Sequence, residues 1–548
     1  MKLQAFIFCG KGNELVPFSN PASILNPTDI ENLNTANPST ASKKSDGSAF
    51  ISGDNPRLPK ALLPVANRPM IEYVIDWCDQ ANFYEINIVA HINEINLIKN
   101  GLSQFLSLRN EQFNLISKSV STGNNSNELN LLPKQINFIP TNFTSTTEIV
   151  AIDLLDKIKY DFVLLPSDFI TDIPPQLFIN QFANRDDDNL AMTVYYKHSM
   201  EFTVDKKQND KNQFFTVYSD PKNGSKNPVL LDIYSKQDVS KTKYLQIRSH
   251  LLWKYPNSTV STKLINSSIY FCSFELTQLL SKKIEDEENA IEEDDDNDAE
   301  EGIVDNKEEQ AKIHPSYFSK QLNRKLIKDH INTKNSTLSK LFRDLSRRSW
   351  QHCKLPRETI SIFIIPQSTS FIRCNNLNAL MDATRFILKI KSNLISVSNS
   401  LIGNDSIVDP SSQIMERSSI KLSAVGNNCK IGSKCRISGS IILNDAEIDD
   451  ECILENVIIG PNAKINKKSK LTNCYVEGNY VVEAKSMLKG ETLSKLYLND
   501  ELEDEHTLDD VSYDDEDEDT DEESDSEDSY EDNYFDDNEY EDDGLFER

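Results

Sequence analysis

The most regular pattern of apolar positions in this chain lies between residues 408 and 488. Apolar side chains recur there in triplets with a step of six residues, and successive triplets start 17 residues apart. A fixed short period is typical of a solenoid, in which each repeat packs on its neighbours. Three short strands per turn, each with one inward apolar side chain, predict a left-handed parallel β-helix of hexapeptide repeats. The inward positions are Val408, Ile414, Ile420, Val425, Ile431, Ile437, Ile442, Ile448, Leu454, Ile459, Ile465, Leu471, Val476, Val482 and Leu488.

Ordinary β-hairpins are the alternative interpretation of these apolar runs. Hairpins have no reason to keep a 17-residue register, so the β-helix is favoured. Solenoids of this kind also serve as acyltransferases, which use a histidine as general base. None of the seven histidines lies between Val408 and Leu488, so that activity would need a base from a partner chain.

The N-terminal part of the chain alternates between apolar strands and amphipathic helices. The run Leu3–Cys9 is continuously apolar, as expected of a strand buried in a parallel sheet. The β-α-β-α order predicts an α/β doubly wound domain, which binds ligands at the carboxyl ends of its strands. Further strands are expected at 85–90, 136–140, 162–167 and 361–365, and helices at 69–78, 94–106, 144–158 and 378–388.

Short β-rich runs at 190–196, 214–218 and 229–234 are separated by polar loops. Their length and spacing predict an antiparallel flap beside the main sheet. A strand followed by a helix is expected over residues 267–280.

The charge of the chain is concentrated in two acidic runs. The 548 residues carry a formal net charge of −29, and residues 500–548 alone hold 28 Asp or Glu and one Arg. Residues 285–309 hold 15 Asp or Glu and one Lys, so the rest of the chain is mildly basic. Runs of this composition bury too little apolar surface to fold. The predicted domains are an α/β domain at 1–393, with a disordered insertion at 19–56 and an acidic loop at 284–312, then a β-helix at 394–492 and an acidic disordered tail at 493–548.

Composition also bears on the compartment and on partners. No stretch approaches the ~20 apolar residues of a transmembrane helix, so no membrane contact is expected. Nine cysteines without a C-x-x-C pair predict reduced thiols in the cytosol rather than a disulfide framework or a zinc site. The acidic runs repel nucleic acid, and no DNA is expected as a partner.

Candidate chemistry gathers where the first strands end. Gly10 and Gly12 follow the first strand, and a glycine-rich turn lets backbone N–H groups approach phosphate oxygens. Lys60 would supply a positive charge to the same phosphates. Asp168, at the end of a buried strand, offers a carboxylate that can hold Mg²⁺. A Gly-x-Gly pair alone is also compatible with a simple tight turn.

The order of motifs is more specific than any one of them. After the first strand come Gly10-x-Gly12, Pro59-Lys60, Leu62-Leu63-Pro64, Asn67, Pro69-Met70-Ile71 and Tyr73. This order resembles that of the nucleotidyltransferases that make sugar nucleotides, the pyrophosphorylases, over roughly residues 1–490. The resemblance implies a nucleotidyltransferase-like domain joined to a left-handed β-helix.

Two positions depart from that family. Its first loop reads G-x-G-T-R-L, and Glu14 stands where the resemblance implies an arginine that stabilises the departing pyrophosphate. Counting back ten residues from Ala383 gives Arg373, where a second metal carboxylate is implied. Each unit-charge interaction at ~4 Å is worth about 1 to 4 kcal/mol, depending on the surroundings. We therefore expect a nucleotidyltransferase-like domain without catalytic residues, metal or cofactor, in which Gly10, Gly12, Lys60 and Asp168 are the remnant of a nucleotide pocket.

A narrower resemblance rests on five stretches of the chain. They are residues 8–12, 57–64, 67–73, 242–250 and 342–350. These stretches and the acidic C-terminus resemble the gamma-type members, of fungal kind, of the eukaryotic translation initiation factor 2B family. That factor exchanges guanine nucleotide on initiation factor 2.

This resemblance implies a cytosolic, non-catalytic subunit of an exchange complex. Its partners would be the epsilon subunit first, then the beta, delta and alpha subunits, with initiation factor 2 as the substrate of the complex. The epsilon subunit carries an additional C-terminal helical domain that performs exchange, and the residues after Leu498 are too acidic to form one. The alternative is an active sugar-nucleotide pyrophosphorylase.

One basic segment has two interpretations. Arg343, Arg347 and Arg348 lie at helical spacing near Phe342 and Trp350. They are either a contact for a protein or RNA partner, or the solvated face of an amphipathic helix.

Overall fold

The computed structural model contains two units, residues 1–495 and residues 496–548, and the fold described below belongs to the first. The predicted insertion, acidic loop and tail fall almost wholly outside the described residues, so these three predictions and the domain bounds stay predictions. The described residues are 2–19, 58–81, 83–121, 135–143, 145–186, 188–197, 214–219, 227–236, 239, 243–245, 247, 249–280, 337–351, 359–392 and 402–494, without the side chains of 116–121, 250 and 348–351.

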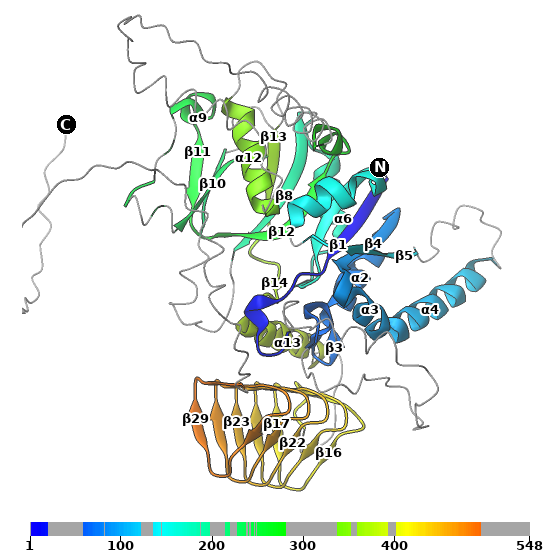
Figure 1. Cartoon of the computed structure of the whole chain (residues 1–548), viewed down its shortest axis with the longest axis vertical. Helices are drawn as coiled ribbons and strands as arrows, with labels where there is room; N and C mark the ends of the chain where they lie inside the picture. Colours follow the sequence, from blue (N-terminus) through cyan, green and yellow to red (C-terminus); the bar gives the residue numbers. More distant parts are fainter. Residues whose placement is uncertain are drawn as a thin grey trace, which may run out of the picture. The chain divides into compact units, whose positions relative to one another are not determined.

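A seven-stranded sheet forms the centre of the N-terminal domain (Figure 1). Its order is β13-β8-β12-β6-β1-β4-β5, and all neighbours are parallel except the two pairs made by β12. The predicted doubly wound, mostly parallel sheet is therefore confirmed. The strands are β1 (Leu3–Phe8), β4 (Glu85–His91), β5 (Ile136–Thr141), β6 (Asp161–Pro166), β8 (Asn189–Lys197), β12 (Leu264–Cys272) and β13 (Thr359–Ile364).

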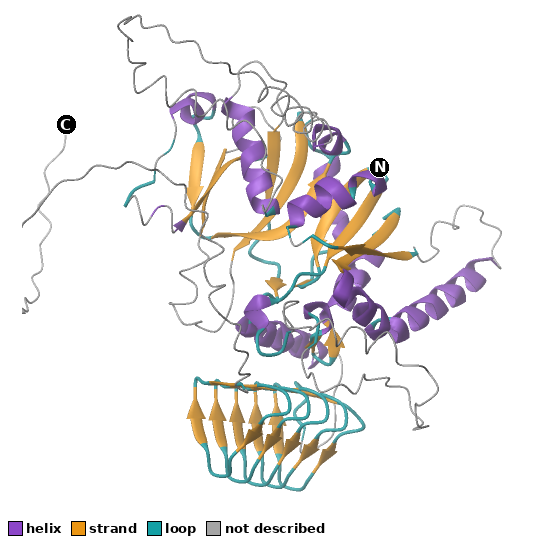
Figure 2. Cartoon of the chain, viewed as in Figure 1, coloured by secondary structure: helices purple, strands orange, loops and turns teal. Residues whose placement is uncertain are grey.

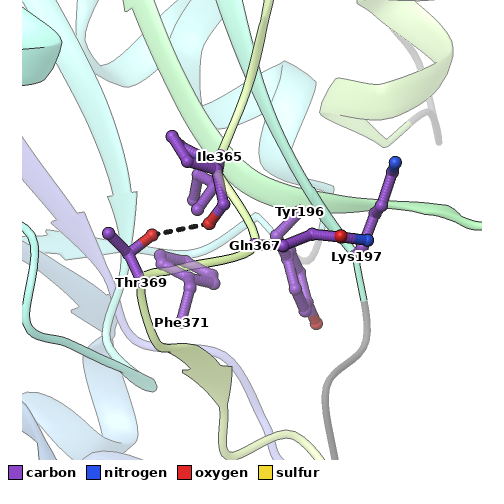
Figure 3. A pocket seen from close by; sticks show the side chains of 7 residues that line it. Tyr196, Lys197, Ile365, Gln367, Thr369 and Phe371 are labelled. Atoms are coloured by element: carbon purple, nitrogen blue, oxygen red, sulfur yellow. Dashed lines mark hydrogen bonds between the residues drawn. The ribbon is translucent and has the colours of Figure 1, made fainter.

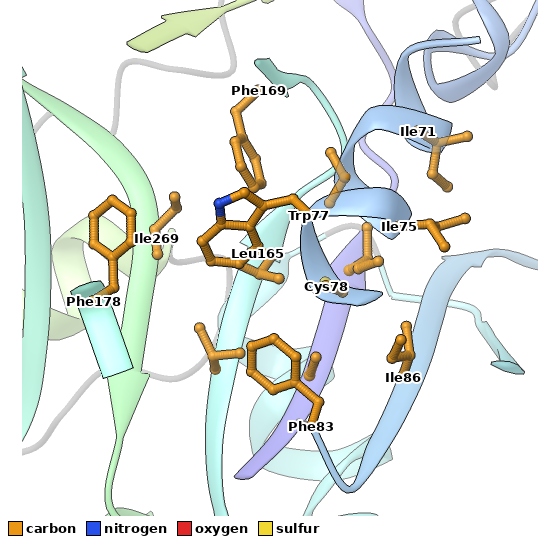
Figure 4. Packing of buried hydrophobic residues seen from close by; sticks show 14 of the residues in the cluster. Ile71, Ile75, Trp77, Cys78, Phe83, Ile86, Leu165, Phe169, Phe178 and Ile269 are labelled. Carbon is orange, nitrogen blue, oxygen red and sulfur yellow. The ribbon is translucent and has the colours of Figure 1, made fainter. Parts of the chain in front are cut away.

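The two faces of this sheet pack into separate apolar clusters. Ala5 and Ile7 of β1 belong to one cluster and Phe6 to the other, because successive side chains of a strand point to opposite faces. Trp77 lies in the first cluster, where its ring meets Phe169 edge-on at 5.3 Å (Figure 4). Its indole N–H donates to the Ile173 carbonyl at 2.9 Å, which satisfies the buried polar atom.

Most predicted helices are present, with shifted ends. The segment expected as one helix over 144–158 is broken into short helical pieces: α5 (Thr146–Glu148), a wider turn at Ile149–Asp153 and a tight turn at Leu155–Lys157. The expected helix at 94–106 is divided at Leu102 into two. The other main helices are α2 (Met70–Asp79), α3 (Ile92–Gly101), α4 (Ser103–Ser121), α6 (Pro175–Ala183), α12 (Leu338–Gln351) and α13 (Leu377–Ser392).

The predicted flap is present with one correction. The run at 190–196 is β8, and it lies inside the main sheet because both of its edges pair, with β12 and with β13. The flap is a three-stranded antiparallel sheet, β10-β9-β11, beside the short helix α9 (Ser249–Lys254). Its strands are β9 (Phe214–Ser219), β10 (Leu230–Ser235) and β11 (Ser258–Ser261).

Helix α12 fixes the flap to the main sheet. Phe342 stacks on Tyr270 of β12 at 4.3 Å, and Arg347 pairs with the buried Asp232 of β10 at 2.8 Å. Arg347 is therefore bound within the domain, which neither of its two interpretations predicted. The side chain of Arg348 lies outside the described residues.

The C-terminal repeats form three stacked parallel sheets, and the 17-residue register is kept at every pairing (Figure 2). Ile420, Ile437 and Leu454, for example, stand one above another. The corners use residues with positive φ at the same period, as at Asn428, Asp445 and Asn462, which suits the short polar side chains there. The strands run from β15 (Ile407–Val408) to β30 (Thr492–Leu493). The predicted left-handed β-helix is thus confirmed.

Helix α13 packs on one sheet of the β-helix through an apolar cluster. Leu380 of α13 and Ile441 and Ile458 of the β-helix belong to this cluster. The Arg385 guanidinium donates to the Asn456 Oδ1 at 2.8 Å and to the Gly439 carbonyl at 3.1 Å. The Tyr475 hydroxyl donates to the Asn378 Oδ1 at 2.8 Å.

Candidate functional site

The candidate site lies where β6 and β1 end. Asp168 follows β6 and is 1% exposed. Strand β7 (Phe169–Thr171) begins directly after it and pairs antiparallel with β14 (Phe371–Arg373), which sets Arg373 opposite Phe169. This pairing brings Arg373 beside Asp168 although 205 residues separate them.

Two cations hold the Asp168 carboxylate. The Arg373 guanidinium reaches both oxygens, with Nη2 at 2.9 Å from Oδ1 and 3.0 Å from Oδ2. The Lys60 Nζ lies 2.6 Å from Oδ2. Arg373 also donates through Nη1 to the Ser268 Oγ at 2.6 Å, which fixes the other end of the guanidinium. Such charge-assisted, two-pronged pairs are the stronger class of hydrogen bond.

The electrostatics of this cluster follow from burial and charge. Burial raises the pKa of the Asp168 carboxyl, but the charges of Arg373 and Lys60 and their hydrogen bonds outweigh burial and hold the pKa at about 2. Burial also disfavours the charged guanidinium of Arg373, yet Asp168 raises its pKa above the usual value. Asp168 and Arg373 therefore stay ionised across the physiological range.

The glycine loop between β1 and this cluster is held by contacts to both sides of the predicted insertion. Gly12 has a φ of +76°, and a Cβ placed on it would come within 2.9 Å of the Lys60 Cβ. The Ser19 hydroxyl donates to the Gly12 carbonyl, and Ser19 forms a parallel bridge with Leu58. Gly12 is thus the residue that lets the loop approach Lys60 closely. Gly10 has open space around it.

Glu14 and Arg373, the two positions that depart from the nucleotidyltransferase pattern, differ in their distance from the site: only Arg373 is part of it. Glu14 is exposed, in a short helical turn at Asn13–Leu15, whose Leu15 is buried. Arg373 lies in the centre of the site, on the carboxylate itself. Of the six residues singled out, the structure therefore brings Gly12, Lys60, Asp168 and Arg373 together.

Glu94 is a titratable residue of this region that the sequence did not single out. It lies in the first turn of α3, is 4% exposed, and interacts with Lys11 of the glycine loop. Burial raises the pKa of its carboxyl to about 7, and the charge of Lys11 offsets part of that rise. Its place just beyond the end of β4, in the first turn of α3, was the available signal, since parallel strands present ligand groups at their carboxyl ends.

A small hollow lies next to the β14 side of the cluster (Figure 3). The hollow has a volume of about 90 Å³. Its lining includes Gln367, Tyr196 of β8 and Phe371 of β14. A pocket for a drug-sized or nucleotide-sized ligand usually has ~300 Å³ or more. This hollow is therefore too small for a nucleoside triphosphate.

Two negative findings concern the described residues only. Within the ranges given above, no three or more His, Cys, Asp or Glu side chains are grouped so that they could hold a metal ion. No helix in that part of the chain combines the length and the apolar character needed to cross a bilayer.

Comparison with known proteins agrees with this architecture. Residues 389–488 match a family model described as the EIF2B subunit epsilon LbH domain, where LbH denotes a left-handed β-helix. A curated protein from Schizosaccharomyces pombe (strain 972 / ATCC 24843), "Translation initiation factor eIF2B subunit gamma", is 27% identical over 237 residues. That match covers 41% of this chain and 43% of the relative, less than half of either. By these matches the chain is similar to eIF2B-type proteins, and its fold, an α/β domain followed by a left-handed β-helix, agrees with them.

Proposed function

We propose that this chain is the gamma subunit of translation initiation factor 2B. In this role it supports the exchange of GDP for GTP on initiation factor 2 in the cytosol, beside the epsilon subunit and then the beta, delta and alpha subunits. The name of the fission-yeast relative and the epsilon-type β-helix match support this role. The exchange step itself belongs to the epsilon subunit in this proposal.

The proposed absence of catalysis rests on one observation, the pairing of Asp168 with Lys60 and Arg373. Metal-assisted nucleotidyl transfer needs carboxylate oxygens that are free to bind a divalent cation. Here one carboxylate faces two cations, and a guanidinium stands at the second ligand position. These residues do not fit Mg²⁺, because the two fixed positive charges would repel it.

In this proposal the remnant nucleotide pocket no longer binds a nucleotide, and its residues contribute to the packing of the domain. Lys60, the residue expected to bind phosphate groups, forms an ion pair with Asp168 instead. The Lys60 side chain is 11% exposed. Glu14 adds a negative charge on the loop beside Gly12. Gly10, Gly12, Lys60 and Asp168 then keep the shape of a nucleotide site while serving stability and assembly.

Two measurements test the proposal separately. Co-expression with an epsilon subunit should yield a complex of equal stoichiometry, and that complex should release GDP from initiation factor 2 faster than epsilon alone. A chain that stays apart from epsilon would contradict the subunit role.

The purified chain, given NTP, sugar phosphate and Mg²⁺, should release no pyrophosphate. Pyrophosphate release by the purified chain would instead establish an active pyrophosphorylase.

A further inference from the structure

The flap exposes a concentration of apolar side chains that the proposed function does not use. They lie on α9, on β11 and just before α9. Single exposed apolar residues are ordinary, but several within one short stretch indicate a contact surface. The residues and their exposed fractions are Trp253 at 79%, Tyr244 at 62%, Leu252 at 42% and Val260 at 42%.

The same stretch is strongly basic. Residues 236–263 contain six Lys or Arg and one acidic residue, Asp238. Lys243, Lys254 and Lys263 are exposed, and the last two lie on either side of β11 along the chain. The surface therefore attracts negative charge, most strongly at low ionic strength.

Among the described residues, no strand pairs with the outer edge of β11. In the described sheet β11 is the end strand, paired with β9 on one side. Val260 stands opposite Val217, so both side chains lie on one face of the sheet. Val217 is buried against Leu251 of α9, whereas Val260 continues the same apolar face to the edge. A further strand would place a side chain beside Val260 and gain main-chain hydrogen bonds.

The charges decide which kind of strand fits. An edge flanked by lysines repels a second copy of itself, which is how proteins discourage edge-to-edge association. An extended segment rich in Asp or Glu gains from the same lysines. RNA is also negatively charged, but it has no strand backbone to pair with β11.

We propose that β11 is a docking edge for an acidic, extended segment of a partner protein. The segment pairs its backbone with Ser258–Ser261, packs an apolar side chain beside Val260, and sets its carboxylates near Lys254 and Lys263. Trp253 provides an exposed ring on the neighbouring helix α9. This docking is separate from the Asp168 cluster and does not depend on it.

The test uses the full chain and a labelled 12-residue peptide of alternating Glu and Val. We expect saturable binding that weakens at least about tenfold in Lys254→Glu/Lys263→Glu, because attraction becomes repulsion. The control variant Lys434→Glu/Lys468→Glu changes the net charge equally on the exposed β-helix surface and should bind as the wild type does. Amide hydrogen exchange should slow at residues 258–261 when the peptide binds.

Several results would overturn the proposal. They are the absence of saturable binding in low salt, equal weakening by the control variant, binding without slower exchange in β11, and tighter binding of a 12-nucleotide oligo(U) through the same two lysines. The last result would assign the surface to RNA. Binding that emerges only when residues 285–309 are removed would assign the edge to the chain's own acidic run and would also reject a partner segment.

Discussion

Arg373 forms an ion pair with both carboxylate oxygens of Asp168. Its Nη2 atom lies 2.9 Å from Oδ1 and 3.0 Å from Oδ2. The pair joins β14 to the end of β6, and Lys60 completes it from a third part of the chain. Loss of Arg373 would leave Lys60 to balance the Asp168 charge, but it would remove the hydrogen bonds that the guanidinium makes to both carboxylate oxygens.

Arg373→Ala should therefore destabilise the protein by ~2 kcal/mol, since hydrogen bonds to a charged group contribute about 1.5–3 kcal/mol. Urea unfolding measures the free energy of unfolding directly. Lys434→Ala provides the control, because its pair with Glu451 is about half exposed, and exposed pairs contribute ~0.5 kcal/mol. Equal losses in the two variants would mean that Asp168 does not rely on Arg373.

Arg373→Asp should create a cation site beside Asp168. The change sets a second carboxylate near Asp168, and two carboxylates are a common ligand set for Mn²⁺ and Mg²⁺. Millimolar Mn²⁺ should raise the thermal midpoint of this variant by a few degrees, and Arg373→Asn, which lacks the charge, serves as its control. An equal rise in the wild type would contradict our account of the site.

Glu94→Gln should change how stability depends on pH. The folded-state pKa of Glu94 is raised to about 7, so the folded protein holds a proton that the unfolded chain releases at lower pH. The wild type should therefore lose stability relative to Glu94→Gln as the pH rises from about 4.5 to about 7, by up to ~3 kcal/mol. Chemical unfolding at pH 5 and at pH 8 measures the difference in free energy of unfolding between the wild type and Glu94→Gln at each pH. A constant difference would mean that the Glu94 carboxyl is not perturbed.

The two glycines of the first loop should respond differently to alanine. Gly12→Ala forces a Cβ to within 2.9 Å of the Lys60 Cβ and keeps a positive φ, so we expect a loss of ~1–2 kcal/mol and a displaced Lys60. Gly10→Ala meets nothing within 4 Å and should have little effect on stability. Thermal unfolding of the pair compares the positions directly. A larger effect at Gly10 would contradict the packing described here.

The sequence predicted the β-helix because its register is local and repeated, so every coil supplies the same information. It also located Arg373, because the spacing to α13 is carried along a short continuous stretch. It did not predict that Lys60 and Arg373 meet on one carboxylate, since that contact depends on the pairing of β7 with β14.

Two further features depended on three-dimensional packing. The run at 190–196 has the same apolar pattern in the main sheet as it would in a flap, so the pattern alone could not assign β8 to a sheet. The raised pKa of Glu94 depends on burial in the folded chain, which no spacing in the sequence reveals.

The bridge between Ser19 and Leu58 has a practical consequence for engineering. The two ends of the segment that joins these residues therefore lie next to each other. Its length can change without moving the residues on either side, because closing a longer loop costs only about 0.6 kcal/mol per doubling. A reporter domain whose own termini lie close together can therefore be grafted between them, leaving Gly12 and Lys60 in register.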